Sequence, residues 1–359
     1  MNMIRVLMLG NHASVKGGIT SVITQIIEHD WEYDGIEMRF IPTYIETSYV
    51  KKIIYFAKAY FKIRKEIRKN KPDVIHIHMS YKGSFIRKYE IHKLCMNYGI
   101  PDVIHLHGSE FKKWFDESNK ESQKKIKKLL KESSAFIVLG NEWDKAVKQI
   151  EPKTKTVVVS NTIHLPEQIA SWNDEFQVLF LGVLIQRKGV ADLLQAINLL
   201  QRSEKIGNAH FVISGSGAEE DKLINQANNL KLDKYVEFIG WTAGVEKTEL
   251  LCKSQMLILP SYNEGLPIAI LEAISYGLPI VATDVGDISA VVKDGINGYL
   301  IEPGNIKAMA EAISNIIIMN KETYGVMSAA SRRIAERFSD EKYFRELKQC
   351  YECIGDRKQ

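Results

Sequence analysis

The chain alternates short apolar runs, rich in β-branched residues, with longer segments of helical periodicity, and it does so twelve times. This alternation is typical of βαβ units, in which helices join parallel strands. The predicted strands of the first half are 5–9, 37–41, 73–78, 102–106, 135–139 and 156–159. Those of the second half are 177–181, 210–214, 235–239, 256–259, 279–282 and 298–301.

The periodicity lapses once, between Ser160 and Phe176, where Pro166 stops regular structure. We therefore expect an α/β fold of two doubly wound domains, at 1–165 and 166–339. A closed eightfold barrel is the alternative for the same alternation. The length of 359 residues suits two domains better than a single core.

Composition excludes several classes of protein. The formal net charge is only +4, so we expect no nucleic-acid partner. Four cysteines are too few for a disulfide scaffold, and Cys350 and Cys353 lie in a helical pattern, where they share a face, rather than in a zinc or redox motif. Because the sequence shows no signal peptide and no apolar run of membrane-spanning length, we expect a cytoplasmic protein.

The stretch from Leu259 to Ala273 carries the strongest functional signal. A strand ends at Leu259, a polar loop follows, and the apolar pattern predicts a helix that starts near Leu266. Glu264 then lies at the N-terminus of this helix, with Glu272 about two turns further on. In open parallel sheets such turns bind ligands, and their free N–H groups attract negative charge. The alternative is that Glu264 only caps the helix.

Two other strand ends carry groups suited to phosphate. Arg187 and Lys188 follow the strand at 177–181, where a guanidinium fork and an ammonium could grip phosphate oxygens, although such pairs are often solvated. Gly17 and Gly18 form a turn after the first strand, which lets backbone N–H groups approach a phosphate. Because the turn matches neither a dinucleotide fingerprint nor a P-loop, neither nicotinamide nor ATP is indicated.

Together these features resemble a family 4 retaining glycosyltransferase of the GT-B fold, over essentially the whole chain. The residues that carry the resemblance occur in the family's order and spacing: Gly17, Gly18, His107, Arg187, Lys188, Glu264 and Glu272. The resemblance implies two Rossmann-like domains that face each other across a cleft holding the donor. It also implies a final helix, 340–359, that returns to the first domain.

The resemblance further implies roles for single residues. Arg187 and Lys188 would neutralise the departing nucleoside diphosphate. Glu264 would lie beside the transferred sugar, and Glu272 would accept hydrogen bonds from the ribose hydroxyls. The remaining implied donor contacts are His107, Gly17, Gly18, Gly215 and the backbone of Gly265, Leu266 and Pro267. Pro267 departs from the glycine that many members carry, and a proline lacks the N–H donor.

The predicted reaction transfers a sugar from a nucleotide diphosphate, expected to be a UDP-sugar, to a hydroxyl of a glycan or lipid-linked acceptor. We expect retention at the anomeric carbon and a role in cell-surface polysaccharide synthesis. No cofactor and no metal are expected, because the cations and helix N-termini supply the positive potential. The alternatives are a nonhydrolytic nucleotide-sugar epimerase and a catalytically idle nucleotide-sugar-binding partner subunit.

Two histidine pairs end neighbouring predicted strands. His76 and His78 share one face of their strand, as do His105 and His107, because strand side chains alternate with period two. Four imidazoles could suggest a metal site, but no carboxylate triad accompanies them. We expect packed, hydrogen-bonded histidines and no metal.

The segment 49–71 is strongly basic. Nine lysines and arginines, at 51, 52, 58, 62, 64, 65, 68, 69 and 71, face a single acid, Glu66, and apolar and aromatic residues lie between them. A basic amphipathic helix is typical of a segment that lies on an anionic membrane surface, here the inner face of the membrane. The alternative, equally open, is an ordinary cationic surface helix that packs one face on the sheet.

Overall fold

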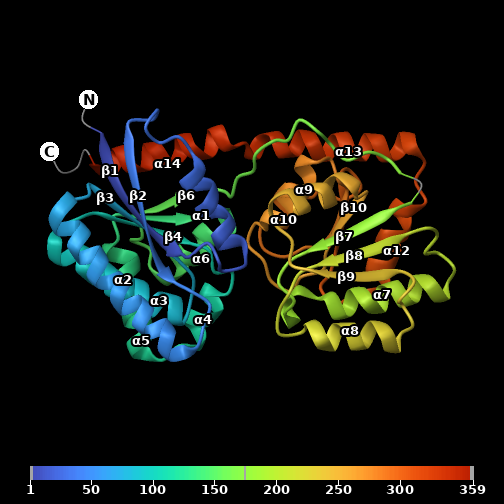
Figure 1. The fold of residues 1–359 in the computed structure, drawn as a ribbon, viewed down its shortest axis with the longest axis horizontal. Coiled ribbons are helices and arrows are strands. Elements are labelled where there is room, and N and C mark those ends of the chain that lie inside the picture. The colour runs from blue at the N-terminus through green and yellow to red at the C-terminus, as the bar shows by residue number, and fades with distance from the viewer. Residues whose placement is uncertain (1–2, 174, 356–359) are drawn as a thin grey trace. The chain divides into compact units, whose positions relative to one another are not determined.

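The computed structural model describes residues 3–173 and 175–355. The chain divides into two compact units, unit 1 with residues 1–161 and 341–359 and unit 2 with residues 162–340. Each unit is built on its own six-stranded parallel sheet with helices on both sides (Figure 1). The predicted α/β fold of two Rossmann-like units is thus confirmed, and the barrel alternative is wrong.

Unit 1 has the strand order β2-β1-β3-β4-β5-β6. Its strands are β1 Ile4–Asn11, β2 Ile36–Tyr44, β3 Val74–Met79, β4 Asp102–Leu106, β5 Ala135–Val138 and β6 Thr156–Val158. Its helices are α1 Gly18–Glu28, α2 Tyr49–Asn70, α3 Gly83–Tyr98, α4 Phe111–Glu117, α5 Lys120–Glu132, α6 Asn141–Ile150 and α14 Asp340–Gly355. Every residue of β3, β4 and β5 is buried, as expected for parallel strands covered on both faces.

Unit 2 has the strand order β12-β11-β10-β7-β8-β9. Its strands are β7 Gln177–Leu181, β8 His210–Ser214, β9 Val236–Gly240, β10 Met256–Leu259, β11 Ile280–Thr283 and β12 Gly298–Ile301. Its helices are α7 Val190–Arg202, α8 Glu220–Asn229, α9 Gly244–Lys253, α10 Ile268–Ser275, α11 Ile288–Val291, α12 Ile306–Ile317 and α13 Lys321–Ala335, with short 3-10 turns η1 Gln186–Lys188 and η2 Glu336–Phe338.

All twelve predicted strands are present. Five of them, β4, β7, β8, β10 and β12, have the predicted bounds, and the largest error is at β2, which continues to Tyr44 instead of Ile41. The extra residues of β2 pair with the end of β1, where the register shifts at Asn11. Where such a strand ends depends on its pairing with a neighbouring strand. The sequence of the strand itself does not show which segment that neighbour will be.

The last helix, α14, follows unit 2 in the sequence and packs in unit 1. Tyr351 is fully buried and its hydroxyl lies 2.7 Å from Nδ1 of His76 on β3. Phe344 stacks on His29, with ring centroids 3.7 Å apart. Cys350 and Cys353 are free thiols on this helix, as the helical pattern predicted. The residues of the predicted helix beyond Gly355 lie outside the described part of the chain.

Across residues 3–173 and 175–355, the helices all fall short of the combined length and apolar character that crossing a membrane requires.

The Tyr351 hydroxyl provides a test of how α14 is held. Tyr351→Phe leaves Nδ1 of the buried His76 without its partner, so we expect the free energy of unfolding to fall by about 1–3 kcal/mol. Tyr343→Phe is the matched control, because the buried Tyr343 hydroxyl has no hydrogen-bond partner among the described residues. Urea denaturation measures both variants, and equal effects of the two would contradict the assignment.

Candidate active site

In both sheets the chain reverses its direction of winding at one position. This switch point lies between β7 and β10 in unit 2 and between β1 and β3 in unit 1. Ligands of open α/β sheets bind at the carboxyl ends of the strands that flank such a point. In unit 2 these ends lead to Arg187 and Lys188 on one side and Glu264 on the other.

The structure brings Glu264, Lys188 and Arg187 together at this switch point. Lys188 Nζ donates to Glu264 Oε1 at 2.5 Å, and Ser261 Oγ donates to the same oxygen at 2.7 Å. Arg187 Nη1 lies 3.9 Å from Glu264 Oε2 and donates to the carbonyl of Asn263 at 2.7 Å. The Glu264 side chain is only 9% exposed, whereas that of Arg187 is 35% exposed. The buried carboxylate is therefore compensated, and the guanidinium keeps donors that face outward.

Close backbone approaches hold the loops of this site in place. Gly189 has a φ of +71°, and a Cβ there would lie 2.0 Å from the carbonyl oxygen of Pro260. A Cβ on Gly215, after β8, would lie 2.0 Å from the carbonyl oxygen of Gly182, after β7. Only glycine permits such contacts without a shift of the backbone. Gly215, predicted as a donor contact, thus has a packing role here.

The helix after Glu264 starts two residues later than predicted. Helix α10 begins at Ile268, with Pro267 as its N-cap residue, so Glu264 precedes the helix and is not its N-cap residue. The ring of Pro267 explains the difference, because a residue that precedes proline is driven out of the helical region. Leu266 is buried, and the carbonyl of Gly265 accepts a hydrogen bond from the N–H of Asp287.

Glu272 lies on α10 and pairs with Lys247 of α9, an ion pair that the sequence analysis missed. Both side chains are largely buried, at 19% and 26% exposure. Lys247 carried no local signal, because it is one of several charged residues on α9. Gly286 was missed as well. It has a φ of +60°, and a Cβ there would lie 2.2 Å from the carbonyl oxygen of Glu264.

In unit 1, the glycine turn and His107 lie at the carboxyl ends of β1 and β4. Gly17 has a φ of +129°, a conformation that favours glycine, and its carbonyl accepts hydrogen bonds from Thr20 and Ser21 in the first turn of α1. His107 shares a hydrogen bond of 2.8 Å with His78, between Nε2 and Nδ1. Burial lowers the pKa of His107 to about 3, so a neutral imidazole stands at the end of β4.

The four histidines form two hydrogen-bonded rows, stacked on each other. His76 and His105 form one row, with Nε2 and Nδ1 3.2 Å apart, and His78 and His107 form the other. Stacking joins His76 to His78 and His105 to His107, with ring centroids 4.5 and 4.2 Å apart. The predicted placement of each pair on one face is confirmed.

Nitrogens of His76, His78 and His105 lie within 4.8 Å of one another, which is close enough to consider a metal. Their ring planes, however, are within 28° of parallel. Ring nitrogens coordinate in the plane of the ring, and tetrahedral zinc needs three such directions that converge on one point about 2.0–2.1 Å from each nitrogen. This arrangement suits hydrogen bonds between the rings better than coordination.

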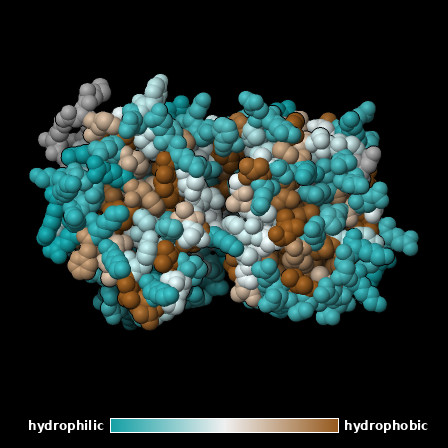
Figure 2. All heavy atoms as spheres, viewed as in Figure 1, coloured by the Kyte–Doolittle hydropathy of each residue, from teal (hydrophilic) through white to brown (hydrophobic). Residues whose placement is uncertain are grey.

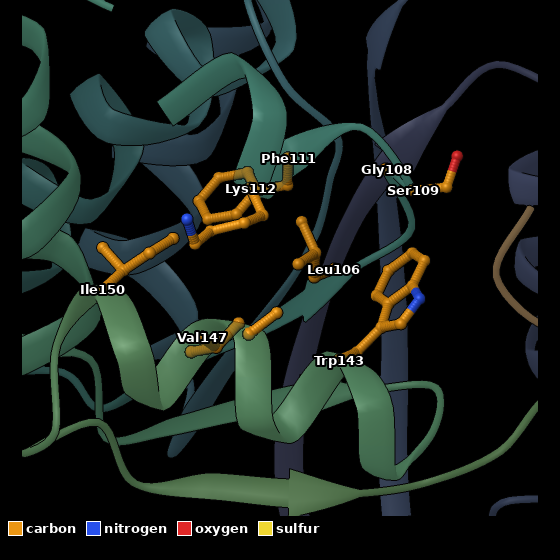
Figure 3. Close-up of a pocket in the computed structure, with 9 residues that line it drawn as sticks. Leu106, Gly108, Ser109, Phe111, Lys112, Trp143, Val147 and Ile150 are labelled. Atoms are coloured by element: carbon orange, nitrogen blue, oxygen red, sulfur yellow. The ribbon is translucent and has the colours of Figure 1, made fainter. Parts of the chain in front are cut away.

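A small apolar pocket opens directly after His107, in unit 1. Figure 3 shows it between α4 and α6, with Trp143 rising from α6 towards the loop of Gly108 and Ser109. Its apolar lining consists of Leu106, Phe111, Trp143, Ala146, Val147 and Ile150. Such a lining can accept an apolar group of a ligand beside the polar end of β4. The sequence analysis did not find it.

Family models match both units. The model described as Glycosyltransferase Family 4 matches residues 9–166, and that described as Glycosyl transferases group 1 matches residues 161–333.

Three curated relatives illustrate the similarity. An uncharacterized glycosyltransferase of Haemophilus influenzae is 33% identical over 220 residues, which cover 59% of this chain and only 60% of that relative. One of Methanocaldococcus jannaschii is 26% identical over 99% of this chain and 100% of its own length. The third, from Escherichia coli, is named UDP-Gal:alpha-D-GlcNAc-diphosphoundecaprenol alpha-1,3-galactosyltransferase and is 26% identical over 90% of this chain and 85% of its own.

Solved structures share the fold at low identity. Sucrose-phosphate synthase of Thermosynechococcus elongatus has a TM-score of 0.83 at 16% identity and covers 98% of this chain and 99% of its own. Alr3699/HepE of Anabaena, in complex with UDP-glucose, has a TM-score of 0.76 at 18% identity and covers 97% of this chain and 99% of its own.

The approach of Gly189 to Pro260 gives a test of the loop geometry. Gly189→Ala adds a Cβ in a left-handed conformation against a carbonyl oxygen, so we expect a loss of about 2–4 kcal/mol in the free energy of unfolding. Gly325→Ala is the control. It lies inside α13 with open space around its Cβ position and should gain about 0.5–1 kcal/mol. Guanidinium titration compares the two, and an unchanged Gly189→Ala variant would refute the packing.

Proposed function

This chain belongs to the glycosyltransferases of group 1 and family 4, and on that premise we propose that it transfers a sugar from a UDP-sugar to a lipid-linked acceptor with retention at the anomeric carbon. One observation carries the proposal. Arg187, Lys188 and Glu264, from two loops 76 residues apart, meet at the switch point of unit 2, where α/β sheets bind ligands.

In this proposal Arg187 is the main contact of the donor diphosphate. Its guanidinium carries five N–H donors, and its hydrogen bond within the protein uses one nitrogen, on the Asn263 carbonyl. Lys188 is held by Glu264 and adds positive charge from a fixed position. The two cations stabilise the charge that develops on the leaving diphosphate, and no metal ion takes part.

Glu272 is the proposed ribose contact. Its carboxylate is paired with Lys247 and can also accept hydrogen bonds from vicinal hydroxyls. The UDP-glucose in the complex of the similarly folded HepE supports uridine as the base of the donor. Glu264, with Lys188 and Ser261 on one oxygen, has its second oxygen available for the transferred sugar.

Retention follows, in this proposal, from attack of the acceptor on the face that the diphosphate leaves, with the leaving phosphate taking the acceptor's proton. His107 is neutral, so it can donate a hydrogen bond to the donor sugar without adding charge. The anomeric coupling constant of the product, measured by NMR, decides between retention and inversion. An inverted product would contradict this part of the proposal.

The acceptor assignment has separate support. The Escherichia coli relative is named for an acceptor carried on diphosphoundecaprenol, a membrane lipid. Helix α2 packs one face on the sheet and leaves apolar residues of another face exposed. Ala59, Ile63 and Ile67 are buried against the sheet, whereas Val50, Ile53, Ile54 and Phe61 are 50–67% exposed. We call these four exposed residues the apolar stripe.

The apolar stripe has the spacing of one helix face, and exposed lysines such as Lys58, Lys62 and Lys65 accompany it. Figure 2 shows hydrophobic side chains gathered over α2 at the lower left of the molecule. We propose that this face rests on the anionic inner surface of the membrane, where lysines meet headgroups and the stripe enters the acyl boundary. The protein would then work at the surface that carries its acceptor in polysaccharide synthesis.

Donor binding can be tested residue by residue with isothermal titration of UDP. Arg187→Gln and Glu272→Gln each remove a charged contact, so we expect the dissociation constant to rise about 10- to 100-fold. Glu249→Gln on α9 is the control, because Glu249 is exposed and should leave binding unchanged. Failure of the unaltered protein to bind UDP would refute the proposal. Formation of an isomerised sugar from UDP-GlcNAc without acceptor would favour the epimerase.

Membrane contact can be tested by co-sedimentation with vesicles of phosphatidylglycerol and phosphatidylcholine. The triple variant Val50→Ser, Ile53→Ser, Phe61→Ser removes apolar area that would enter the bilayer, so we expect at least about tenfold weaker binding. The matched control changes three exposed apolar residues of unit 2, Val245→Ser, Ile318→Ser and Val326→Ser. The idea fails if both triple variants sediment alike.

A further inference from the structure

A cluster of cations lies where β2 ends and α2 and α3 begin. Arg87 and Lys88 lie in the second turn of α3, and Lys52 lies in the first turn of α2. The Arg87 guanidinium lies over the ring of Tyr44, 4.6 Å from its centroid, and Lys52 Nζ lies 5.3 Å from the same centroid. All these residues belong to unit 1.

Arg87 is half-buried, and no acid pairs with it. Its Nε is buried and has no hydrogen-bond partner within residues 3–173 and 175–355, and no carboxylate of that part of the chain lies within salt-bridge distance of its guanidinium. Glu46, the nearby acid, is already bound by Lys52 and by the hydroxyl of Tyr44. A desolvated guanidinium without an acceptor costs free energy, which an anionic ligand would recover.

Lys88 is the second basic group of the cluster without a carboxylate partner among the described residues. Its side chain is 2% exposed, and its hydrogen bond within the described chain goes to the hydroxyl of Thr43, which donates in turn to the carbonyl of Gly10. Burial and the charge of Arg87 lower the pKa of Lys88 to about 7. The ammonium form is therefore destabilised by its surroundings, and an anion nearby would restore it.

We propose that Arg87 and Lys88, beside the ion pair of Lys52 and Glu46, form an anion site that binds the phosphate of a lipid-linked acceptor. This inference rests on the proposed function, since it names the part of the acceptor that unit 1 recognises. The guanidinium lies over the tyrosine ring, and its planar fork of N–H donors suits the oxygens of a phosphate or diphosphate.

The position of the site favours a phosphate on a lipid over a free one. Lys52 lies in the first turn of α2, where the apolar stripe also begins, but two residues after Val50 it points to another side of the helix. A headgroup held by Arg87 would thus lie across the start of α2 from the surface that is proposed to enter the membrane. The sugar that the phosphate carries would extend from the carboxyl end of the sheet.

Isothermal titration with farnesyl diphosphate, in saturating UDP to occupy the cations of unit 2, tests the site. We expect Arg87→Gln to weaken binding at least about tenfold. Arg87→Lys keeps the charge but not the fork, so its affinity should lie between those of the unaltered protein and Arg87→Gln. Lys93→Gln is the matched control, because Lys93 lies on the same helix and is already paired with Glu90. Farnesol, which lacks the phosphates, should not bind in an Arg87-dependent way.

Proton uptake gives a second measurement. Around Lys88 the charged or titratable neighbours are Arg87 on α3 and His78 on β3, whose pKa burial holds well below its usual value. A bound anion raises the pKa of Lys88, so at pH 8 Lys88 should take up a proton when the ligand binds. The measured binding enthalpy should then change with the ionisation enthalpy of the buffer. Lys88→Met should abolish this uptake.

The outcomes separate the two proposals. If UDP binds and farnesyl diphosphate binds equally to the unaltered protein and Arg87→Gln, the anion site is wrong and the transferase proposal stands. If inorganic pyrophosphate binds as tightly as farnesyl diphosphate and with the same dependence on Arg87, the lipid assignment is wrong. If UDP itself does not bind, the proposed function fails.

Discussion

The ion pair of Glu264 and Lys188 is the constraint on which the candidate active site depends. A carboxylate that is only 9% exposed needs compensation, and Lys188 and Ser261 supply it on a single oxygen. The pair links the loop after β7 to the loop after β10, which are neighbouring strands at the switch point. Gly189 makes the link feasible, because the loops could not meet if it carried a side chain. Charge and backbone geometry therefore fix the same contact.

Unit 1 uses its strand ends differently. Its polar groups at the carboxyl ends of β3 and β4 are four neutral histidines, arranged in rows and covered by Tyr351 of α14. Burial keeps the pKa values of these rings low, so the rows contribute hydrogen bonds and shape without net charge. The chain thereby ties its last helix to its third strand, and it presents an uncharged donor at His107.

The sequence allowed the strands and the histidine faces to be predicted for physical reasons. Parallel strands buried on both sides must be short apolar runs, and the period of two places His76 with His78 without knowledge of neighbours. Contacts between distant segments could not be predicted in this way. Lys188 and Glu264 were each recognised, but their pairing depends on the order of strands in the sheet. Three further residues are singled out only by their contacts with residues that are remote in the chain, namely Lys247, Gly286 and Arg87. The helix after Glu264 starts later than its apolar pattern indicates, because Pro267 disfavours a helical conformation at Leu266.

The two units differ in how their cations are balanced, and this difference bears on what each can bind. In unit 2 a carboxylate compensates Lys188 and lies 3.9 Å from Arg187, so the proposed diphosphate would meet cations that already have partners. Binding there need not be tight, which suits a product that must leave after each transfer. In unit 1, Arg87 and Lys88 have no acid of their own, and the cost of burying them is already present in the free protein. An anion at that position would relieve this cost, so the proposed site of unit 1 would hold its phosphate more firmly than the cations of unit 2 hold theirs.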